Sequence, residues 1–532
     1  MKQKQFWFLR IPVLFSALLC AVTGASIFYA MRNFWVFYDP NMIFLGGSMG
    51  VFLLAIATIA LLLALAVLRL YVPKWKSDAA VFPKAMRICA VVGFVLAALA
   101  FIGGIVILCA SGAEPFSDFL LYLKKDLPYL GAFLAGAALL LLLPLLSGKG
   151  KAVLAGALAL CIALASLGSI FPFRAFRFVA APVVMDTGKD YAVVFATSDK
   201  GTGYVEYTYQ GREYTLYAEA HGRRIGDRHI HAVHIPYEHL NNNPYTIGST
   251  RVVENFGYGS RLGKTISAGP YTLKVNTGKT QSYLCISDWH TQLKKAKAAI
   301  AQLGDYDALI MLGDPAGDMS FEEQAVRYIV QFGGEITGGT MPVIFVRGNH
   351  ETRGAFAADL PAYLGYERLY YTVQRGAYSF LVLDSGEDKP DDHVEYGGLD
   401  DYARQRAAML EWLQTRPKTG DKLVVLSHAW QVCEPETETK QSLAAWNEMD
   451  RLGARFLISG HTHVCEFLNR ENTQAAPYLA AHPSITAYID GGIQSNKNYI
   501  ASKLTLSPTG VHFEAADNTG EKVMDTTLPW HP

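Results

Sequence analysis

Five short motifs in the second half of the 532-residue chain combine carboxylate, amide and imidazole side chains. In chain order they are Asp288-Trp289-His290, Gly313-Asp314, Gly348-Asn349-His350-Glu351, Ser427-His428 and Gly460-His461-Thr462-His463. Their donor atoms are oxygens and imidazole nitrogens, without a thiolate, which suits a pair of hard to borderline divalent ions. Two such ions held close together can clamp and hydrolyse a phosphate ester.

The elements predicted around these motifs would place them at strand ends. Beyond residue 282, short apolar runs typical of strands alternate with amphipathic runs typical of helices. Strands are predicted at 283–287, 308–312, 343–347, 378–383, 423–427, 456–459, 485–489, 500–506 and 511–515, and helices at 292–303, 321–332 and 402–414. The side chains at or just past a strand's carboxyl end are Asp288, Asp314, Asn349, His428 and His461. Ligands gather at that edge in layered α/β folds, so we expect these side chains to meet there.

Residues 178–280 show a different pattern, with short β-rich runs separated by turn residues. This spacing predicts a β-sandwich. The segment also carries five histidines: His221, His229, His231, His234 and His239. Alternation along a strand puts His229 and His231 on one face and His234 on the other, so no convergent metal site is indicated. We interpret these histidines as exposed strand and loop residues.

The first 177 residues are apolar and almost free of acids. Five apolar runs, at about 11–31, 42–68, 88–112, 127–147 and 152–171, are each near or above the length of a spanning helix. The segment is therefore predicted to be a membrane α-helical bundle of five transmembrane helices. None of the runs contains Asp, Glu, Lys, Arg or His. This favours an anchor or a lipid-facing module over a transporter.

Lys and Arg in the short loops predict the orientation of these spans. Most of them fall before the first span, after the second or after the fourth: Lys2, Lys4, Arg10, Arg69, Lys74, Lys76, Lys84, Arg87, Lys149 and Lys151. By the positive-inside rule the N-terminus is cytoplasmic, and five crossings leave the catalytic part outside the cytoplasm. We thus expect a multi-pass protein of the plasma membrane. Cleavage of the first run as a signal peptide is the alternative, and it would not move the catalytic part.

Bulk charge and cysteine content give little information on partners. The 47 Lys and Arg balance the 47 Asp and Glu, so no basic field predicts nucleic-acid binding. Cys433 and Cys465 each follow one of the motifs and could meet in a disulfide, but two cysteines form no framework that would settle the pairing. The sequence leaves the oligomeric state open.

From about Ser282 to the C-terminus, the five motifs in this order resemble those of the calcineurin-like metallophosphoesterases. The resemblance implies a four-layer α-β-β-α domain over 281–532 and two divalent ions, Mn, Fe, Zn or Co. The segment before it, with Ala192–Thr197 and His231–Ile235, resembles the fibronectin type III-like domain that precedes the catalytic domain of purple acid phosphatases.

Roles for single residues follow from the resemblance. It implies one metal on Asp288, His290 and His463, and the other on Asn349, His428 and His461. It also implies that Asp314 bridges the two and that a hydroxide between the metals attacks phosphorus. His350 would serve as general acid or stabilise phosphoryl charge.

Arginines flank the third motif, and the run Arg347 to Glu351 resembles the Arg-Gly-Asn-His-Glu of serine/threonine protein phosphatases. Arg347 and Arg353 could bind phosphate oxygens bidentately, or each could pair only with a local carboxylate.

Two differences from related phosphatases narrow the metals and the substrates that we expect. Gly317 stands where purple acid phosphatases carry a tyrosine that ligates ferric iron, and His290 stands where they have glycine. No coloured ferric-tyrosinate site is therefore expected. The run after Asp314 also lacks the arginine of the protein phosphatases, which argues against phosphoprotein substrates.

Three hypotheses of function remain. The first is a membrane-anchored phosphoesterase that cleaves phosphomonoesters or phosphodiesters of envelope lipids, polymers or extracellular nucleotides, with a lipid-linked substrate as one option. The second is a catalytically silent metal-binding sensor on a membrane bundle. The third is a transporter with an accessory domain, which the uncharged spans disfavour. Retention of all seven ligand positions and His350 favours catalysis over sensing.

Overall fold

The structure is a computed structural model, and it describes residues 176–530 except 220, 257–258, 394–397, 419, 421, 434–438 and 496–497. The chain divides into two units, 1–174 and 175–532, and the description below concerns the second. All five predicted membrane spans lie outside the described residues. Within the described ranges, no helix is both long and apolar enough to cross a membrane.

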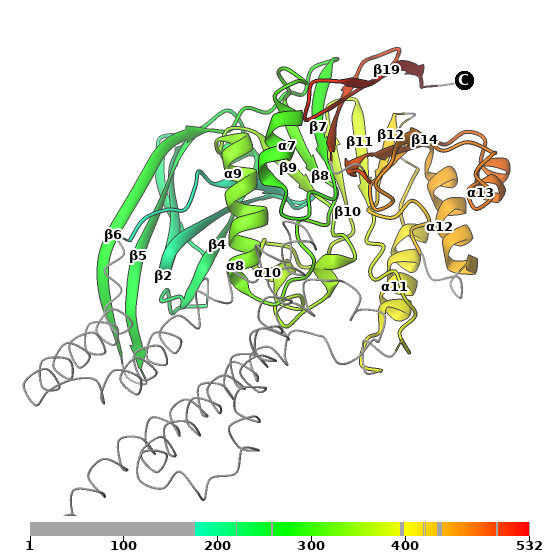
Figure 1. The fold of residues 1–532 in the computed structure, drawn as a ribbon. Coiled ribbons are helices and arrows are strands. Elements are labelled where there is room, and N and C mark those ends of the chain that lie inside the picture. Colours follow the sequence, from blue (N-terminus) through cyan, green and yellow to red (C-terminus); the bar gives the residue numbers. More distant parts are fainter. Residues whose placement is uncertain are drawn as a thin grey trace, which may run out of the picture. The chain divides into compact units, whose positions relative to one another are not determined.

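Two β-sheets form the centre of this unit (Figure 1). The first has the order β19-β18-β17-β7-β8-β9-β1-β2-β5-β6, with β16 on β17 and with β3 and β4 on β2. The second has the order β10-β11-β12-β13-β15-β14. Their inner faces share one core, in which the ring of Tyr283 lies 4.7 Å from that of Phe380 and the ring of Phe456 lies 5.5 Å from that of Phe513.

The strands of the first sheet that lie nearest the motifs are β7 (Gln281–Ile286), β8 (Ala308–Met311) and β9 (Pro342–Phe345), with β16 (Gly492–Ile493), β17 (Tyr499–Leu506), β18 (Gly510–Asp517) and β19 (Lys522–Pro529) at one side. The second sheet contains β10 (Tyr371–Arg375), β11 (Tyr378–Val382), β12 (Leu423–Leu426), β13 (Ala454–Ser459), β14 (Cys465–Phe467) and β15 (Thr486–Asp490). Strands β7, β8 and β9 are parallel, as are β11, β12, β13 and β15. Their nearly continuous apolar sequences fit strands that are buried on both faces.

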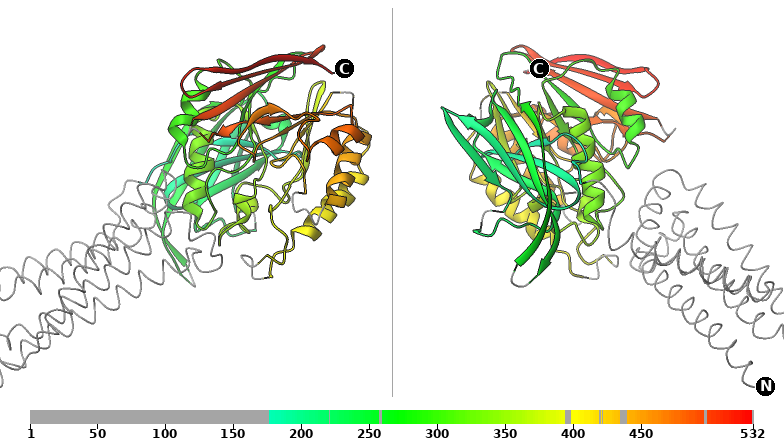
Figure 2. Two further views of the ribbon diagram at one scale, coloured as in Figure 1. Left: turned by 45° about the vertical axis from the view of Figure 1, so that its right-hand side comes forward. Right: turned by 90° about the vertical axis from the view of Figure 1, so that its left-hand side faces the viewer.

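Helices cover the outer face of each sheet (Figures 1 and 2). On the first sheet lie α7 (Leu293–Ile300), α8 (Glu322–Ala325), the π-helix η2 (Val326–Gln331) and α9 (Phe332–Thr337). On the second lie α11 (Tyr402–Gln414), α12 (Thr439–Leu452) and α13 (Ala476–Ala481). Trp412 and Trp446 of these helices share a second core with Leu381 and Val425. The layer order is therefore helix, sheet, sheet, helix.

The β-rich segment has a hydrophobic core of its own, which includes Val193, Val205 and Ile247, but its strands are also hydrogen-bonded into the first sheet. It contains β1 (Val183–Asp186), β2 (Tyr191–Tyr209), β3 (Arg212–Tyr217), β4 (Arg228–Ile235), the short α6 (Tyr237–Leu240), β5 (Pro244–Phe256) and β6 (Gly259–Thr272). Strand β1 pairs in parallel with β9, and β2 pairs with β1, so these strands continue the first sheet. The separate domain at 178–280 stays a prediction, but the sequence did not foresee the pairing of β1 with β9, because strand periodicity does not reveal the pairing partner.

The junction between this segment and the catalytic layers contains a buried ion pair. Arg375 Nη2 donates to Asp186 Oδ2, and Tyr237 Oη donates to Asp186 Oδ1 at 2.6 Å. Burial raises the pKa of Asp186, although Arg375 opposes that shift. The ion pair joins the end of β1 to the end of β10, so the β-rich segment and the second sheet are held together by charge as well as packing.

Two further expectations are settled by the described residues. His231 is 2% exposed, and its Nε2 lies 3.2 Å from Thr197 Oγ1, so the expectation of an exposed histidine was wrong there. No disulfide joins Cys433 and Cys465 in the described part of the chain. Instead, the Cys465 thiol lies 3.3 Å from the Tyr488 hydroxyl.

Candidate metal centre

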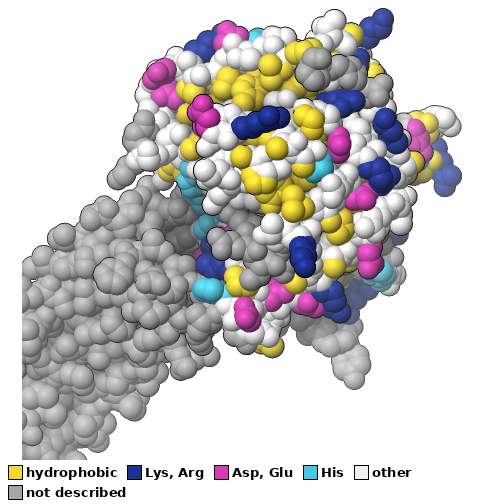
Figure 3. All heavy atoms as spheres, turned by 90° about the vertical axis from the view of Figure 1, so that its right-hand side faces the viewer, with side chains coloured by type: hydrophobic (Ala, Val, Ile, Leu, Met, Phe, Trp, Pro, Cys, Tyr) yellow, Lys and Arg dark blue, Asp and Glu magenta, His cyan; other side chains and the backbone are white. Residues whose placement is uncertain are grey.

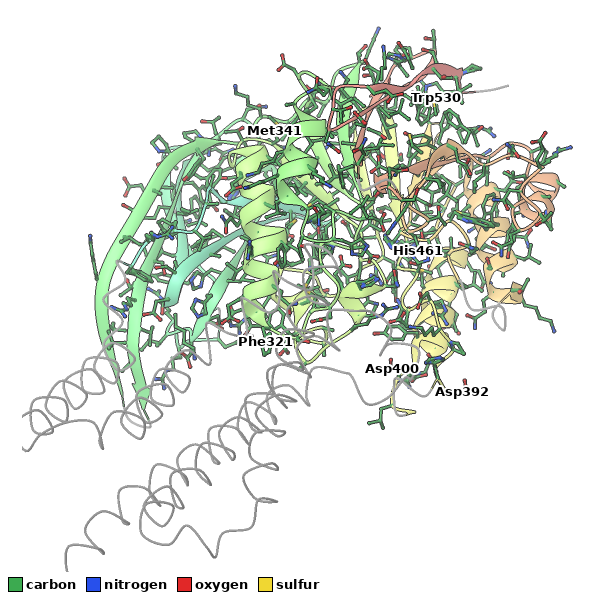
Figure 4. All side chains as sticks on the ribbon, viewed as in Figure 1. Phe321, Met341, Asp392, Asp400, His461 and Trp530 are labelled. Atoms are coloured by element: carbon green, nitrogen blue, oxygen red, sulfur yellow. The ribbon has the colours of Figure 1, made fainter. Side chains whose placement is uncertain are left out.

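The five motifs follow five strand ends, three in the first sheet and two in the second. Asp288 follows β7, Asp314 follows β8 and Asn349 follows β9. His428 and His461 follow β12 and β13. Figure 4 labels His461, which lies between the elements of the two layers. Because the two sheets face each other, these strand ends meet at one edge, and the side chains come together as the sequence predicts.

Asp288, His290 and His463 form one compact group, with donor atoms within 4.8 Å of one another. His463 Nε2 lies 3.2 Å from Asp288 Oδ1 and 3.3 Å from His290 Nε2. One carboxylate oxygen and two imidazole nitrogens directed at a common point are a donor set that divalent transition metals bind.

Asp314, His428 and His461 form a second group of the same kind. His428 Nε2 lies 3.2 Å from Asp314 Oδ2. The side-chain oxygen of Asn349 lies 3.2 Å from His461 Nδ1 and is directed at the acceptor atoms of Asp314 and His428 as well. If the Asn349 amide were turned, its nitrogen could donate hydrogen bonds to these atoms. In the orientation of the structure, its oxygen faces other acceptor atoms instead. Acceptor atoms that face one another in this way suit a bound cation.

Asp314 lies between the two groups. It is 1% exposed, and its Oδ2 is 3.8 Å from His290 Nε2 of the first group and 3.2 Å from His428 Nε2 of the second. A carboxylate has two oxygens that it can share between cations, so this residue is placed to contact both.

The backbone at the ligand positions is unusual. Positive φ angles occur at Asp288 (46°), His290 (33°), Asp314 (58°), His461 (71°) and His463 (56°). Side-chain-bearing residues enter this left-handed region at a cost, and such positions cluster at functional sites. The tight loops after β7, β8 and β13 therefore turn the donor atoms inward at the expense of local stability.

Hydrogen bonds from neighbouring groups orient the ligands. His428 Nδ1 donates to Leu312 O at 2.5 Å, which leaves Nε2 to face the site. Asp288 Oδ2 accepts the backbone N–H of His461 at 2.8 Å. Such partners fix the imidazole tautomer and ring orientation in metal sites.

The electrostatics of the site also favour positive charge. Burial alone would lower the pKa of His428, but the carboxylates of Asp314 and Asp288 outweigh burial and raise it to about 10. Burial likewise opposes ionisation of Asp314, yet His428 and His350 hold its pKa well below the usual range. A potential that retains a proton so firmly also attracts a divalent cation in its place. Two such ions fit the residues present.

His350 is outside the predicted ligand set, but it forms a third group with His290 and Asp314 whose donor atoms lie within 4.8 Å of one another. Its Nδ1 donates to Gly317 O at 2.7 Å, and its Nε2 lies 3.7 Å from Asp314 Oδ2. Burial lowers the pKa of His350 to about 4. The bond to Gly317, at the position where purple acid phosphatases carry tyrosine, fixes the ring so that Nε2 faces the site.

The two arginines of the third motif have different surroundings. Arg347 Nε and Nη2 donate to Asp384 at 3.0 and 2.7 Å, so its guanidinium forms a bidentate pair with a buried carboxylate, as the local-carboxylate alternative expects. Arg353 also binds a carboxylate, Glu387, but its Nη1 lies 3.4 Å from His350 Nε2. Of the two, Arg353 is the one beside the site.

Several partners of the site were not found from the sequence. Glu351 Oε2 accepts the backbone N–H of Asp314 at 3.0 Å and that of Gly348 at 3.2 Å. Glu387 and Asp384 lie in a loop after β11 with no recognisable motif. A buried acidic residue in an otherwise polar loop has no periodicity to mark it, so only the fold reveals these contacts.

The family comparison agrees with the site. Residues 282–465 match the calcineurin-like phosphoesterase family, and this range contains all five motifs. The chain therefore contains a calcineurin-like metallophosphoesterase domain. That domain makes it a metal-dependent phosphoric ester hydrolase.

Two solved structures are similar to part of the chain, but only at low sequence identity and low TM-score. A conserved protein of Streptococcus pneumoniae TIGR4, described as a predicted phosphoesterase, is 11% identical, with a TM-score of 0.24, over 47% of this chain and 98% of its own. A metallophosphoesterase from Sphaerobacter thermophilus is 16% identical, with a TM-score of 0.22, over 46% of this chain and 89% of its own. At such scores neither likeness bears on the fold. No curated protein matches the chain.

Proposed function

We propose that this protein is a membrane-anchored phosphoesterase that uses two divalent metal ions to hydrolyse phosphomonoesters or phosphodiesters outside the cytoplasm. The observation that carries the proposal is the pair of donor groups, Asp288–His290–His463 and Asp314–His428–His461, with Asp314 within 4 Å of both. Asn349 completes the second group. Mn, Fe, Zn and Co all suit these ligands.

In the proposed hydrolysis, the metal ions and the side chains of the protein have different roles. Bound divalent ions supply Lewis acidity and make water a stronger nucleophile. His350 Nε2 faces the same space, because Nδ1 is held by Gly317 O. Because Nδ1–H is donated to Gly317 O, Nε2 carries a proton only in the imidazolium form of the ring; in that form it can pass the proton to the leaving-group oxygen of the ester, which is the role of a general acid. Arg353, at 3.4 Å from that nitrogen, is placed to hold a phosphoryl oxygen.

The membrane and compartment parts of the proposal are supported by the sequence alone. Five apolar runs without Asp, Glu, Lys, Arg or His precede residue 176, and the Lys and Arg of their loops favour an external catalytic unit. The substrate would then be a phosphate ester of the envelope or the exterior, with a lipid-linked ester as the more specific option. Protease treatment of intact cells should cleave the catalytic unit, and protection of that unit until the cells are lysed would refute this orientation.

Nucleic acid is not proposed as a partner. Figure 3 shows one face of the protein, on which Lys and Arg alternate with Asp and Glu among the described residues. This face therefore lacks the single-sign field that binds a phosphate backbone.

Turnover of two test esters decides the activity. The full-length protein, loaded with Mn²⁺, should hydrolyse p-nitrophenyl phosphate, bis-p-nitrophenyl phosphate or both. His350→Gln should retain its metal and lose turnover. A protein that holds two metals and cleaves neither ester would contradict the proposal and favour the sensor alternative.

A further inference from the structure

Arg353 connects the metal centre to a pair of acidic residues that no motif marks. Its Nε donates to Glu387 Oε2 at 2.8 Å and its Nη2 to Glu387 Oε1 at 2.6 Å. Nη2 also donates to Asp388 Oδ1 at 2.9 Å. On the other side, Nη1 lies 3.4 Å from His350 Nε2. The guanidinium is therefore held along one edge by carboxylates while another nitrogen faces the reaction centre.

Glu387 has the features of a fixed anionic partner. It is 1% exposed, and its Oε2 also accepts the Thr352 hydroxyl at 2.9 Å. Burial would raise the pKa of Glu387, but hydrogen bonds and charge from Arg353 hold it well below its usual range. Its backbone oxygen accepts Arg406 Nη1 from α11 at 3.4 Å. A buried carboxylate fixed in this way keeps the bidentate fork of an arginine in one orientation.

We propose that Glu387 is a positioning residue that directs Arg353 toward a non-bridging phosphoryl oxygen of the substrate, next to His350. The proposal rests on the phosphoesterase function proposed above and extends it to a residue outside the five motifs. Arg353 contacts the phosphoryl group, and Glu387 acts through Arg353. A charged donor placed before the reaction begins needs no reorganisation when charge develops on that oxygen.

The second arginine pair provides a matched control. Arg347 and Asp384 form the same bidentate geometry, at 3.0 and 2.7 Å, and Asp384 lies only three residues before Glu387. This pair also contacts α11, since Gln405 Nε2 donates to Asp384 and Arg347 lies over the ring of Tyr402, and Asp384 Oδ1 accepts the backbone N–H of Gly386 at 3.2 Å. The Arg347–Asp384 pair thus resembles the Arg353–Glu387 pair in burial and charge, but it is directed at a helix.

The test compares Glu387→Gln with Asp384→Asn in the full-length, Mn²⁺-loaded protein. For Glu387→Gln we expect kcat to fall about tenfold or more with metal content unchanged, because a misaligned oxyanion donor costs up to 10²–10³-fold. We also expect inorganic phosphate to bind about tenfold more weakly by calorimetry. Asp384→Asn should lower the unfolding temperature while kcat and phosphate affinity stay within about threefold of the parent.

Chemical rescue separates positioning from general damage. Millimolar guanidinium should restore part of the turnover of Arg353→Ala, since the Glu387 carboxylate remains to hold the ion. The same addition should fail in the Arg353→Ala/Glu387→Gln double variant. Equal rescue in both, or a Glu387→Gln protein with unchanged kcat and phosphate affinity, would overturn the proposal.

Failure of the proposed function gives a different result. If the parent protein hydrolyses neither ester, the phosphoesterase proposal fails, and phosphate binding still decides the role of Glu387. Weaker phosphate binding in Glu387→Gln than in Asp384→Asn supports the positioning role without turnover. Equal phosphate binding in the two variants refutes it.

Discussion

The Glu351 carboxylate accepts the backbone N–H of Asp314 at 3.0 Å, although the two residues are 37 positions apart. The same oxygen accepts the N–H of Gly348 at 3.2 Å, so Glu351 joins the loops after β8 and β9. Burial raises the pKa of Glu351 to about 8, and the neighbouring charge of Asp314 adds to the shift. Two ligand loops therefore depend on one buried side chain for their spacing.

Glu351→Ala should weaken metal binding about 10–100-fold, as loss of an outer partner commonly does. Alanine removes the oxygen that accepts both N–H groups, so the two loops lose part of their alignment. Metal titration by calorimetry measures the change. Asp307→Ala is a control, because Asp307 accepts the backbone N–H of Ser282 at 2.7 Å at the opposite end of β7. Equal metal affinities for parent and Glu351→Ala would contradict this role.

Gly348→Ala should reduce metal occupancy without unfolding the protein. A Cβ at Gly348 would lie 2.1 Å from Asp314 Oδ1 and 2.6 Å from the backbone nitrogen of Asp314, so the Asp314 carboxylate must move. Gly420→Ala serves as the control, since a Cβ there meets open space. Elemental analysis should find the metal lost from Gly348→Ala alone. Full occupancy in that variant would show that Asp314 is not a ligand as placed.

Acid should destabilise the protein partly through His231. Burial lowers the pKa of His231 to about 3, below the value of about 6.5 for an unfolded histidine. Between these values the unfolded chain binds a proton that the folded protein does not, so stability is present above pH 6.5 and falls as pH decreases. One such group contributes about 1.4 kcal/mol per pH unit. His231→Phe should make the pH dependence of urea unfolding shallower by about that amount between pH 6 and 4, and an unchanged slope would refute the assignment.

Arg375→Ala should destabilise the protein by about 3–5 kcal/mol, because it leaves the buried Asp186 without its cationic partner. Urea unfolding measures the loss. The Asp186→Asn/Arg375→Met double variant removes both charges, and we expect it to recover much of the stability. A loss below about 1 kcal/mol in the single variant would mean that the β-rich segment does not depend on this pair.

The sequence identified the ligands because their positions depend on a local rule. Asp288, Asp314 and His428 each follow a short buried strand, and parallel strands bring such positions to one edge. The same reasoning did not reveal where β1 pairs, since the three apolar residues before Asp186 suit an independent sandwich and an added strand beside β9 equally well. The contact of Glu387 with Arg353 could not be predicted from the sequence either, because the two residues are 34 positions apart and no repeating pattern connects them.

Metal content together with ester turnover tests the central claim most directly. The full-length parent protein, loaded with Mn²⁺, should contain two metal ions per chain by elemental analysis and should hydrolyse a phosphomonoester or a phosphodiester. Asp314→Ala should lose metal and turnover together. His350→Ala should keep both metals while kcat falls about 10²–10⁴-fold. A parent without bound metal, or an Asp314→Ala protein with full metal content and full turnover, would contradict the account.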